Sequence, residues 1–479
     1  MKDNNTILDI IKVTISNLCI VFSGVFVGFL IPKVLGVTEY GYYKIFTLYA
    51  TYVGIFSFGI SEGVYLRYSG TKYDDLDKNK ITYFTRLVFC VQIIIAIVML
   101  AGTLFFLKAE YRYIFISLTV YMLVLNMTTY YQYIAQMTMR FNDYSMRNII
   151  KSIFTVISVI IMLGLYYYNK KQNMSYRYYL FFVVLIAVIL FVMYVKKFSD
   201  ITFGKIKCIE EYLPETKQII KIGIPFLVAS LCATLILTID RQFVSIYFNT
   251  KTYGIYAFAY NMLSLVTVCT AAISTVIYPT LKNTKKDEIK IMYPKLSSYV
   301  LCFVFLALNG YYPLVLFIKW FLPQYTYSLE IFRIVFPGLA FSSVISVVIQ
   351  NYYKLLNRND LFFYQNIFIL IISVIANFIA YYIFRTPSAI SCASIITLII
   401  YYIITEYYFR KKFRVAWKKN FVYAILMTII FYIVTMINNE YIGFILYFIA
   451  FIGVVIILQK NVVNEVVQFI KKGIDKNKE

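Results

Sequence analysis

The sequence predicts an all-α polytopic membrane protein built from two similar halves. Hydrophobic residues make up 61% of the 479 residues and charged residues only 14%, which leaves too little polar surface for a water-soluble globule. Apolar segments long enough to cross a hydrocarbon core of about 30 Å recur along the whole chain. A pattern near residue 40 also returns near residue 253. These observations predict about fourteen transmembrane helices, arranged as two six-helix lobes and a C-terminal helix pair.

Each predicted span must be helical, because a backbone amide left unpaired in lipid costs several kcal/mol. The first span lacks a small-residue cleavage site and is longer than the core of a signal peptide, so we expect it to be retained. The predicted spans are 13–31, 45–66, 87–107, 114–138, 148–168, 178–195, 222–247, 253–279, 296–318, 331–353, 361–384, 390–408, 421–437 and 442–458.

An internal repeat connects the second predicted span with the eighth. A gap-free comparison of 40–67 with 253–280 pairs Tyr40-Gly41 with Tyr253-Gly254, and Ile60-Ser61 with Ile273-Ser274. Ile10-Ile11-Lys12 similarly matches Ile219-Ile220-Lys221. The copies lie an even number of spans apart, so both halves have the same orientation. Parallel repeats of this kind place a substrate site between two bundles near the midplane.

The repeat also predicts the domain boundaries. We expect an N-terminal six-helix lobe at 1–200, a C-terminal six-helix lobe at 201–412, and two additional helices with a cytoplasmic tail at 413–479. The Tyr40-Gly41 and Tyr253-Gly254 segments are then expected to be matching turns on the outer side, each joining two spans.

The positive charges predict the orientation of the chain and its general partner. The formal net charge is +23, and with the N-terminus inside, most of the 46 Lys and Arg residues fall in cytoplasmic ends and loops. This positive-inside bias places both termini in the cytoplasm. Such loops are typical partners of anionic lipid headgroups, so we expect contacts with membrane lipids and none with nucleic acid.

The residue types argue against an enzyme with a soluble catalytic site. Histidine is absent, and the seven cysteines form no C-x-x-C pair, so we predict no metal site and no disulfide framework. No G-x-x-x-x-G-K-[ST] phosphate loop is present. No long polar connection could hold a separate domain. We therefore assign no catalytic residues and no cofactor.

A polar stripe on the predicted span 114–138 indicates a cavity. Asn126, Tyr133, Gln136 and Arg140 share one helical face with two threonines, over a length that crosses most of the membrane. Polar side chains inside a span usually face a bundle interior or water. The alternative is that these polar side chains, Gln136 and Arg140 included, contact neighbouring helices and serve packing alone.

The predicted span 222–247 carries a second stripe that ends in charge. Arg241 shares a face with hydroxyl side chains such as Thr234 and Thr238, whereas Asp240 points elsewhere, because adjacent helical residues do not face each other. We expect Arg241 to face the cavity and Asp240 to reach another helix or water. The alternative is that both lie near the outer interface and extend toward it.

A third stripe lies on the predicted span 331–353, where Gln350 and Lys354 mirror Gln136 and Arg140. Arg333 lies off this face near the other end of the span, and Pro337 could kink the helix between Arg333 and the polar face. Glu62 lies within the G-x-x-x-G spacing of Gly59 and Gly63, which allows close helix approach.

The carboxylates within the spans divide into two groups. Glu62 and Asp240 are the candidate coupling carboxylates, since any proton coupling without histidine must use carboxylates. Glu406 with Arg410 is interpreted as an interfacial i,i+4 ion pair.

Several of these segments resemble a known family. Ile31-Pro32 through Gly36 to Tyr43, followed by Gly59-Ile60-Ser61-Glu62-Gly63, is similar to the opening of bacterial Wzx-type polysaccharide flippases. Ile224-Pro225 through Asp240-Arg241 to Tyr253-Gly254 is similar to the start of that family's second half, and Gln136 to Asn142-Asp143 also matches. These segments fall within about the first 360 residues.

The resemblance implies a flippase of the multidrug/oligosaccharidyl-lipid/polysaccharide (MOP) exporter superfamily. Such a protein moves undecaprenyl-pyrophosphate-linked oligosaccharide across the bacterial plasma membrane by alternating access, for surface polysaccharides such as capsule or O-antigen. The implied partners are the lipid-linked oligosaccharide and membrane lipids, with a polysaccharide polymerase and chain-length machinery as further partners. In some members the last two helices border a groove for the lipid tail, which 421–437 and 442–458 would form here.

Two other functions stay open at this point. A cation-coupled multidrug exporter of the same superfamily is expected to have a more acidic cavity than this chain shows. A membrane-embedded polysaccharide polymerase is expected to need a long outer loop with catalytic residues, which the sequence lacks.

Overall fold

The computed structural model describes residues 2–206, 209–282, 284–356, 358–414, 418–437, 439–465 and 468. Within them the chain is helical and contains no strand. Ten of the described helical segments are long and apolar enough to cross a membrane, or eleven if one bent pair is counted as a span. The chain is therefore a multi-pass membrane protein of all-α class, as its composition predicts. The total of fourteen spans stays a prediction.

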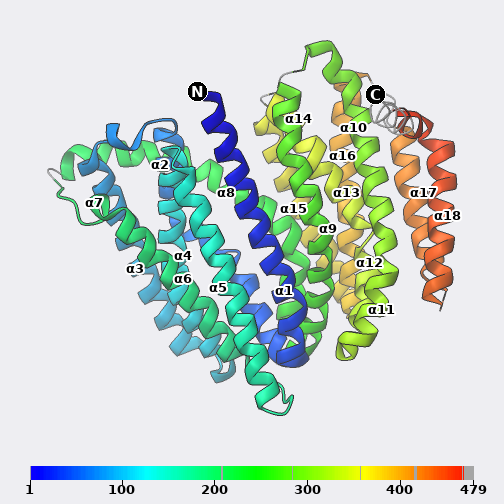
Figure 1. Cartoon of the computed structure of the whole chain (residues 1–479), viewed down its shortest axis with the longest axis horizontal. Coiled ribbons are helices and arrows are strands. Elements are labelled where there is room, and N and C mark those ends of the chain that lie inside the picture. The colour runs from blue at the N-terminus through cyan, green and yellow to red at the C-terminus, as the bar shows by residue number, and fades with distance from the viewer. Residues whose placement is uncertain are drawn as a thin grey trace, which may run out of the picture. The chain divides into compact units, whose positions relative to one another are not determined.

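The chain divides into two compact units, Met1–Gly254 and Ile255–Glu479. The elements of the first unit are α1 (Lys2–Ala50), η1 (Val53–Ser57), α2 (Ile60–Tyr68), η2 (Tyr73–Asp75), α3 (Lys78–Phe106), α4 (Ala109–Met137), α5 (Phe141–Tyr168), α6 (Tyr176–Lys197), α7 (Ser199–Thr202) and α8 (Ile209–Tyr247). Helix α9 (Thr250–Lys282) begins in this unit and continues into the second (Figure 1).

The second unit contains the remaining elements. They are α10 (Lys286–Ala307), η3 (Leu308–Gly310), α11 (Tyr311–Phe321), η4 (Pro323–Tyr325), α12 (Ser328–Val335), α13 (Gly338–Val344), the π-helical turn η5 (Ile345–Ile349), α14 (Gln350–Leu355), α15 (Asn359–Phe384), α16 (Pro387–Phe413), α17 (Lys418–Val434) and α18 (Glu440–Leu458). Most of the predicted cytoplasmic tail lies outside the described residues.

The expected turns at the two Tyr-Gly segments are not present. Residues 40–43 are helical within α1, and 253–256 are helical within α9. The first helix changes direction earlier, at Gly36, whose φ of 72° and ψ of 176° leave the helical region. Glycine adopts a positive φ without the steric cost that a Cβ imposes. The turn prediction was wrong because Tyr and Gly were interpreted as loop residues, although both are common in membrane helices.

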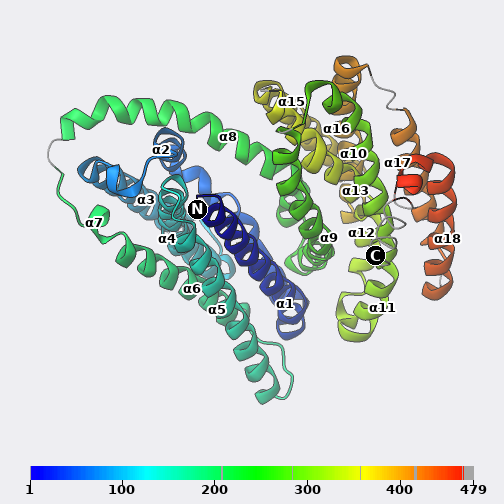
Figure 2. The ribbon, with the colours of Figure 1, turned by 45° about the horizontal axis from the view of Figure 1, so that its top comes forward.

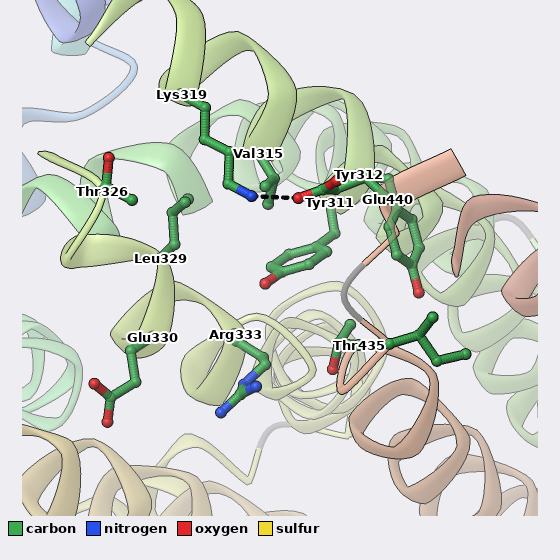
Figure 3. Close-up of a pocket in the computed structure, with 11 residues that line it drawn as sticks. Tyr311, Tyr312, Val315, Lys319, Thr326, Leu329, Glu330, Arg333, Thr435 and Glu440 are labelled. Carbon is green, nitrogen blue, oxygen red and sulfur yellow. Dashed lines mark hydrogen bonds and ion pairs between the residues drawn. The ribbon is translucent and has the colours of Figure 1, made fainter. Parts of the chain in front are cut away.

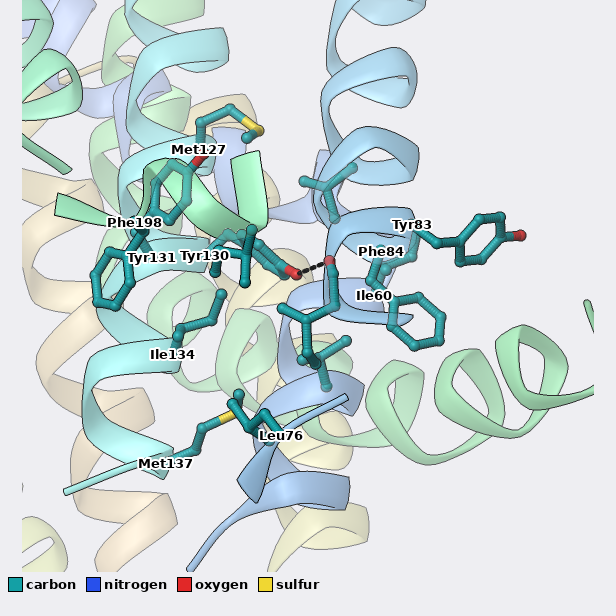
Figure 4. Packing of buried hydrophobic residues seen from close by; sticks show 14 of the residues in the cluster. Ile60, Leu76, Tyr83, Phe84, Met127, Tyr130, Tyr131, Ile134, Met137 and Phe198 are labelled. Carbon is teal, nitrogen blue, oxygen red and sulfur yellow. Dashed lines mark hydrogen bonds between the residues drawn. The ribbon is translucent and has the colours of Figure 1, made fainter. Parts of the chain in front are cut away.

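A buried aromatic and aliphatic cluster holds the first unit together. It includes Ile60 and Val64 of α2, Phe84 of α3, and Tyr130 and Ile134 of α4. The Tyr130 hydroxyl lies 3.4 Å from the Ile81 carbonyl oxygen and so has a partner in the apolar interior (Figure 4). A buried polar group without a partner would cost several kcal/mol in lipid. The cluster therefore fixes α2 against α3 and α4.

Candidate functional site

The second membrane segment of the first unit is interrupted. Helix α1 ends at Ala50, η1 follows, and α2 begins only at Ile60, after Phe58 and Gly59 with φ of 48° and 76°. Backbone carbonyls in such a break lose their helical partners and must find others. Interrupted helices of this kind commonly line the binding sites of membrane transporters. The break is therefore the place around which we build the candidate site.

Amide side chains from two helices satisfy the carbonyls of the break. Asn126 of α4 donates to the Val53 carbonyl at 3.0 Å and to the Gln92 side-chain oxygen at 2.8 Å. Gln92 of α3 in turn donates to the Phe56 carbonyl at 2.8 Å. Asn126 is only 4% exposed. Asn126 thus hydrogen-bonds neighbouring segments, as the packing alternative for the polar stripe predicts.

Helix α8 approaches the same region from its other side and forms what we call the α1–α8 seam: Lys44, Tyr49, Tyr52, Thr238, Asp240, Arg241, Gln242 and Tyr253. The Tyr52 hydroxyl donates to Thr238 Oγ1 at 2.8 Å, and Gln242 Nε2 donates to the Tyr49 hydroxyl at 2.9 Å. The Tyr253 hydroxyl donates to the Lys44 carbonyl at 3.3 Å. The seam is a band of polar contacts between apolar helices.

The seam contains the two charged residues that the sequence singles out on α8. Asp240 is 3% exposed and interacts electrostatically with Tyr52 and Tyr253. Arg241 Nε lies 3.9 Å from Asp240 Oδ1, and its Nη2 donates to the Leu237 carbonyl at 2.5 Å. The Arg241 side chain keeps 29% of its surface exposed. A buried acid therefore lies beside a cation that a ligand can still reach.

Sequence reasoning missed Lys44. This residue lies on α1, with its ammonium nitrogen 5.2 Å from the ring centroid of Tyr40 and 5.8 Å from that of Tyr43. It is close enough to Arg241 for the two cations to repel each other. The signal was present, since Lys44 is the lone cation of an otherwise apolar run, but the run was interpreted as a turn. Two cations and one acid give the seam a positive balance.

Glycines allow α8 to approach α2 closely below the seam. A Cβ on Gly223 would lie 1.8 Å from the Gly59 carbonyl oxygen, and one on Gly63 would lie 2.2 Å from the Ile219 carbonyl oxygen. The predicted G-x-x-x-G spacing therefore does bring two helices together. The first repeat pattern and the second also meet, because a Cβ on Gly254 would lie 2.4 Å from the Val37 carbonyl oxygen. Figure 2 shows α8 passing along α2.

Glu62 lies beside the break, on the side of α4. It is 6% exposed, and the Ser57 hydroxyl donates to Glu62 Oε2 at 2.8 Å. Tyr133 interacts electrostatically with Glu62, and its ring centroid lies 5.0 Å from that of Tyr65. The structure thus brings Glu62 and Tyr133 of the predicted residues close together, with Glu62 buried and Tyr133 partly buried.

The other predicted residues lie farther along their helices. Arg140 leaves the polar stripe at the end of α4 and pairs with Asp143 at 2.9 Å, with its guanidinium 4.5 Å from the ring centroid of Tyr73. Gln136 is partly buried one turn before it. In the second unit Gln350 is partly buried at the start of α14, directly after the π-helical turn, and Lys354 is exposed in the last turn of α14.

Glu406 is a buried carboxylate that the sequence interpretation placed wrongly. Instead of an interfacial pair with Arg410, the structure buries Glu406 to 3% exposure beside Tyr293 and Tyr402, while Arg410 is exposed. The i,i+4 spacing suggested the pair, but the neighbouring helix α10 supplies Tyr293. Among the described residues, no group of three or more potential metal-ligand side chains is present.

Comparisons with known proteins agree with this arrangement. A family model described as "Polysaccharide biosynthesis protein" matches residues 10–285. No curated protein sequence matches the chain. The chain is similar to the lipid II flippase MurJ in an inward closed conformation. The alignment covers 96% of this chain and 100% of the MurJ chain, with 14% sequence identity and a TM-score of 0.66.

Two multidrug transporter structures are also similar. A multidrug resistance MATE family transporter of the MOP superfamily, in an inward-facing conformation, aligns with 84% of this chain and 94% of its own, with 14% identity and a TM-score of 0.57. A MATE structure in complex with MaL6 aligns with 85% and 96%, with 14% identity and a TM-score of 0.53. At such identities these structures establish the fold.

The family model covers more than half of the chain, and the shared fold covers nearly all of it. The similar structures are those of a flippase and of multidrug transporters. The chain therefore belongs to the polysaccharide biosynthesis protein family and shares the fold of the flippase MurJ and of MATE transporters.

Proposed function

We propose that this chain moves undecaprenyl-pyrophosphate-linked oligosaccharide units from the inner to the outer leaflet of a bacterial plasma membrane by alternating access. The observation that carries the proposal is the partly exposed Arg241 beside buried Asp240, at an interrupted helix. A guanidinium donates in a fork that matches phosphate oxygens. Membership in a polysaccharide biosynthesis family supplies the class of cargo.

The remaining predicted residues have proposed roles around this headgroup. Lys44 adds a second cation to the seam, which suits the charge of a pyrophosphate. Tyr133 and Gln136 would contact the glycan along α4, with Gln350 and Lys354 in the equivalent positions of the second unit. Glu62 and Asp240 are the proposed coupling carboxylates, because both are buried next to hydroxyl groups.

The test uses Arg241→Ala in a strain that lacks the native gene. We expect loss of surface polysaccharide while the amount of membrane-inserted protein, measured by immunoblot, stays unchanged. Arg112→Ala is the matched control, because Arg112 also donates to one main-chain carbonyl but is exposed outside the seam. Normal surface polysaccharide in the Arg241 variant would sink the proposed role.

A cation-coupled multidrug exporter is the second candidate. It is favoured by Glu62, Asp240 and Glu406, which are buried carboxylates in otherwise apolar helices. Efflux of organic cations from cells, abolished by Glu62→Gln but unaffected by Arg241→Ala, would support it over oligosaccharide transfer. The reverse pattern, in which only polysaccharide depends on the chain, supports the first proposal.

We also propose that both termini lie in the cytoplasm, and that a polysaccharide polymerase and chain-length machinery act on the product. The positive-inside distribution of Lys and Arg supports this orientation. A fluorescent protein fused after Glu479 is expected to fluoresce, and an alkaline phosphatase fused there is expected to be inactive. Cross-linking in cells tests the polymerase contact.

A further inference from the structure

The second unit contains a cavity of about 290 Å³. Residues of α11, α12 and the connection between α17 and α18 line it, and the argument uses Tyr311, Tyr312, Lys319, Glu330, Arg333 and Glu440. Figure 3 shows Arg333 and Glu330 on one wall, with Lys319 and Glu440 above them. We call this cavity the α11–α12 pocket. Its volume is near the lower end of the range of about 300–1,000 Å³ for ligand pockets, so it suits one sugar ring.

Three of the four charged side chains in the pocket already have partners. Lys319 and Glu440 form an ion pair that joins α11 to the start of α18. The Ser388 hydroxyl donates to Glu330 Oε1 at 2.8 Å. Arg333 takes part in none of the ion pairs or side-chain hydrogen bonds found among the described residues. The pocket therefore offers one guanidinium whose donors are available to a ligand.

Two aromatic side chains, Tyr311 and Tyr312, also line the pocket. The ring of Tyr311 stacks on that of Phe332 at 5.5 Å, which holds it in place. Tyr312 is 2% exposed, and its hydroxyl has no hydrogen-bond partner among the described residues. The Tyr312 hydroxyl is therefore closed off, and the residue contributes its ring to the pocket. Aromatic rings beside polar groups are also the usual surroundings of a bound sugar.

We propose that the α11–α12 pocket binds a single acidic sugar residue, with its carboxylate on Arg333 and its hydroxyl groups near Glu330. A carboxylate matches the fork of donors on the guanidinium, and it would give Arg333 the negatively charged partner that no described side chain supplies. A neutral sugar would leave this cation without a counter-charge. With both termini in the cytoplasm, as proposed above, this end of the second unit faces the outside of the cell. The source of the sugar rests on the proposed function: it is the glycan after transfer.

The experiment measures binding directly on the purified full-length chain in nanodiscs. Saturation-transfer NMR is recorded with glucuronate and with glucose for wild type, Arg333→Gln and Arg385→Gln. Arg385 is the matched control, because it is an exposed arginine at the C-terminal end of α15 that does not line the pocket. We expect glucuronate saturation in wild type and in the Arg385 variant, and a loss of at least about tenfold in affinity in the Arg333 variant.

A second variant tests the pocket without removing the charge. A Cβ on Gly443 would lie 2.5 Å from Cε1 of Tyr312, so Gly443→Ala pushes this ring into the pocket and is expected to weaken glucuronate binding. Equal glucuronate saturation in wild type and the Arg333 variant overturns the proposal, and so does equal saturation by glucose. No glucuronate binding in wild type, together with loss of polysaccharide in Arg241→Ala, refutes the pocket alone. Glucuronate binding with normal polysaccharide in Arg241→Ala refutes the proposed function alone.

Discussion

Glycine brings helices together in both units, but it does so against different atoms. In the first unit Gly223 of α8 lies against the backbone of Gly59 and Gly63. In the second unit Gly443 of α18 lies against the ring of Tyr312, which borders the α11–α12 pocket. Backbone cannot move aside without disturbing its own hydrogen bonds, whereas a ring beside a cavity can. The first contact is thus rigid, and the second is adjustable.

The largest effect is expected where backbone meets backbone. Gly223→Ala places a Cβ 1.8 Å from the Gly59 carbonyl oxygen and 2.7 Å from the Gly63 amide nitrogen. Overpacking typically costs about 1–3 kcal/mol, and we expect the upper end of this range or more here. The measurement is the midpoint of thermal unfolding in detergent, with folded yield from size-exclusion chromatography.

Gly164→Ala is the control for this change. Gly164 lies within α5, and a Cβ there would meet no atom within 4 Å. Because alanine favours the helix over glycine, this variant is expected to be as stable as wild type or slightly more stable. If both variants unfold at the wild-type temperature, α8 does not lie against α2 as described.

The next largest effect is expected at the break between α1 and α2, which lies next to the contact of Gly223 with Gly59. Asn126→Ala removes the donor to the Val53 carbonyl and to Gln92, and leaves buried acceptors without a partner. Such a loss costs about 1–3 kcal/mol. Asn148 is an equally buried control, also 4% exposed, whose side-chain nitrogen has no partner among the described residues. Equal destabilisation by Asn148→Ala would show that the break does not depend on Asn126.

The adjustable contact gives a smaller loss of stability. Gly443→Ala crowds only the ring of Tyr312, which can turn into the neighbouring cavity. We therefore expect the change in unfolding free energy to stay below about 1 kcal/mol, less than for Gly223→Ala. Thermal unfolding of both variants under one condition checks this order. A reversed order would mean that the α11–α18 contact is the rigid one.

These contrasts also show what a sequence can reveal about such a chain. The all-α membrane class follows from composition, because lipid permits few other backbone arrangements. The close approach at Gly59 and Gly63 follows from a spacing of small residues. The break at η1 does not follow, since its carbonyls are satisfied by Asn126 and Gln92, which are distant in sequence.

Partners from other helices likewise decide which charged residues can form a site. Glu406 appeared to have a local partner at i+4, but its neighbours Tyr293 and Tyr402 include a side chain from another helix. Lys44 was missed because its helix was interpreted as a turn. Arg333 lay off the predicted stripe, and only the packing of α11, α12 and the α17–α18 connection shows that it lines a separate pocket.

The smallest expected effect is electrostatic. It concerns a polar contact of the first unit that joins η2, α3 and α7 without any glycine. The Tyr73 hydroxyl donates to Asp200 Oδ1 at 2.7 Å, and Lys78 Nζ lies 3.4 Å from Asp200 Oδ2. Burial alone would raise the pKa of Asp200, but the hydrogen bond from Tyr73 and the charge of Lys78 outweigh it and lower this pKa. The ionised carboxylate therefore stabilises the folded state at neutral pH.

The sign of the pH dependence follows from the lowered pKa of Asp200. Its contribution is fully present above the unfolded-state pKa of about 3.9, and is lost as the pH falls through the lower folded-state pKa. We expect the difference in unfolding temperature between wild type and Asp200→Asn to shrink from pH 7 toward pH 3. Asp74→Asn, an exposed neighbour, is the control and should show no such trend. A difference that stays constant with pH would mean that the Tyr73 and Lys78 contacts do not depend on the carboxylate charge.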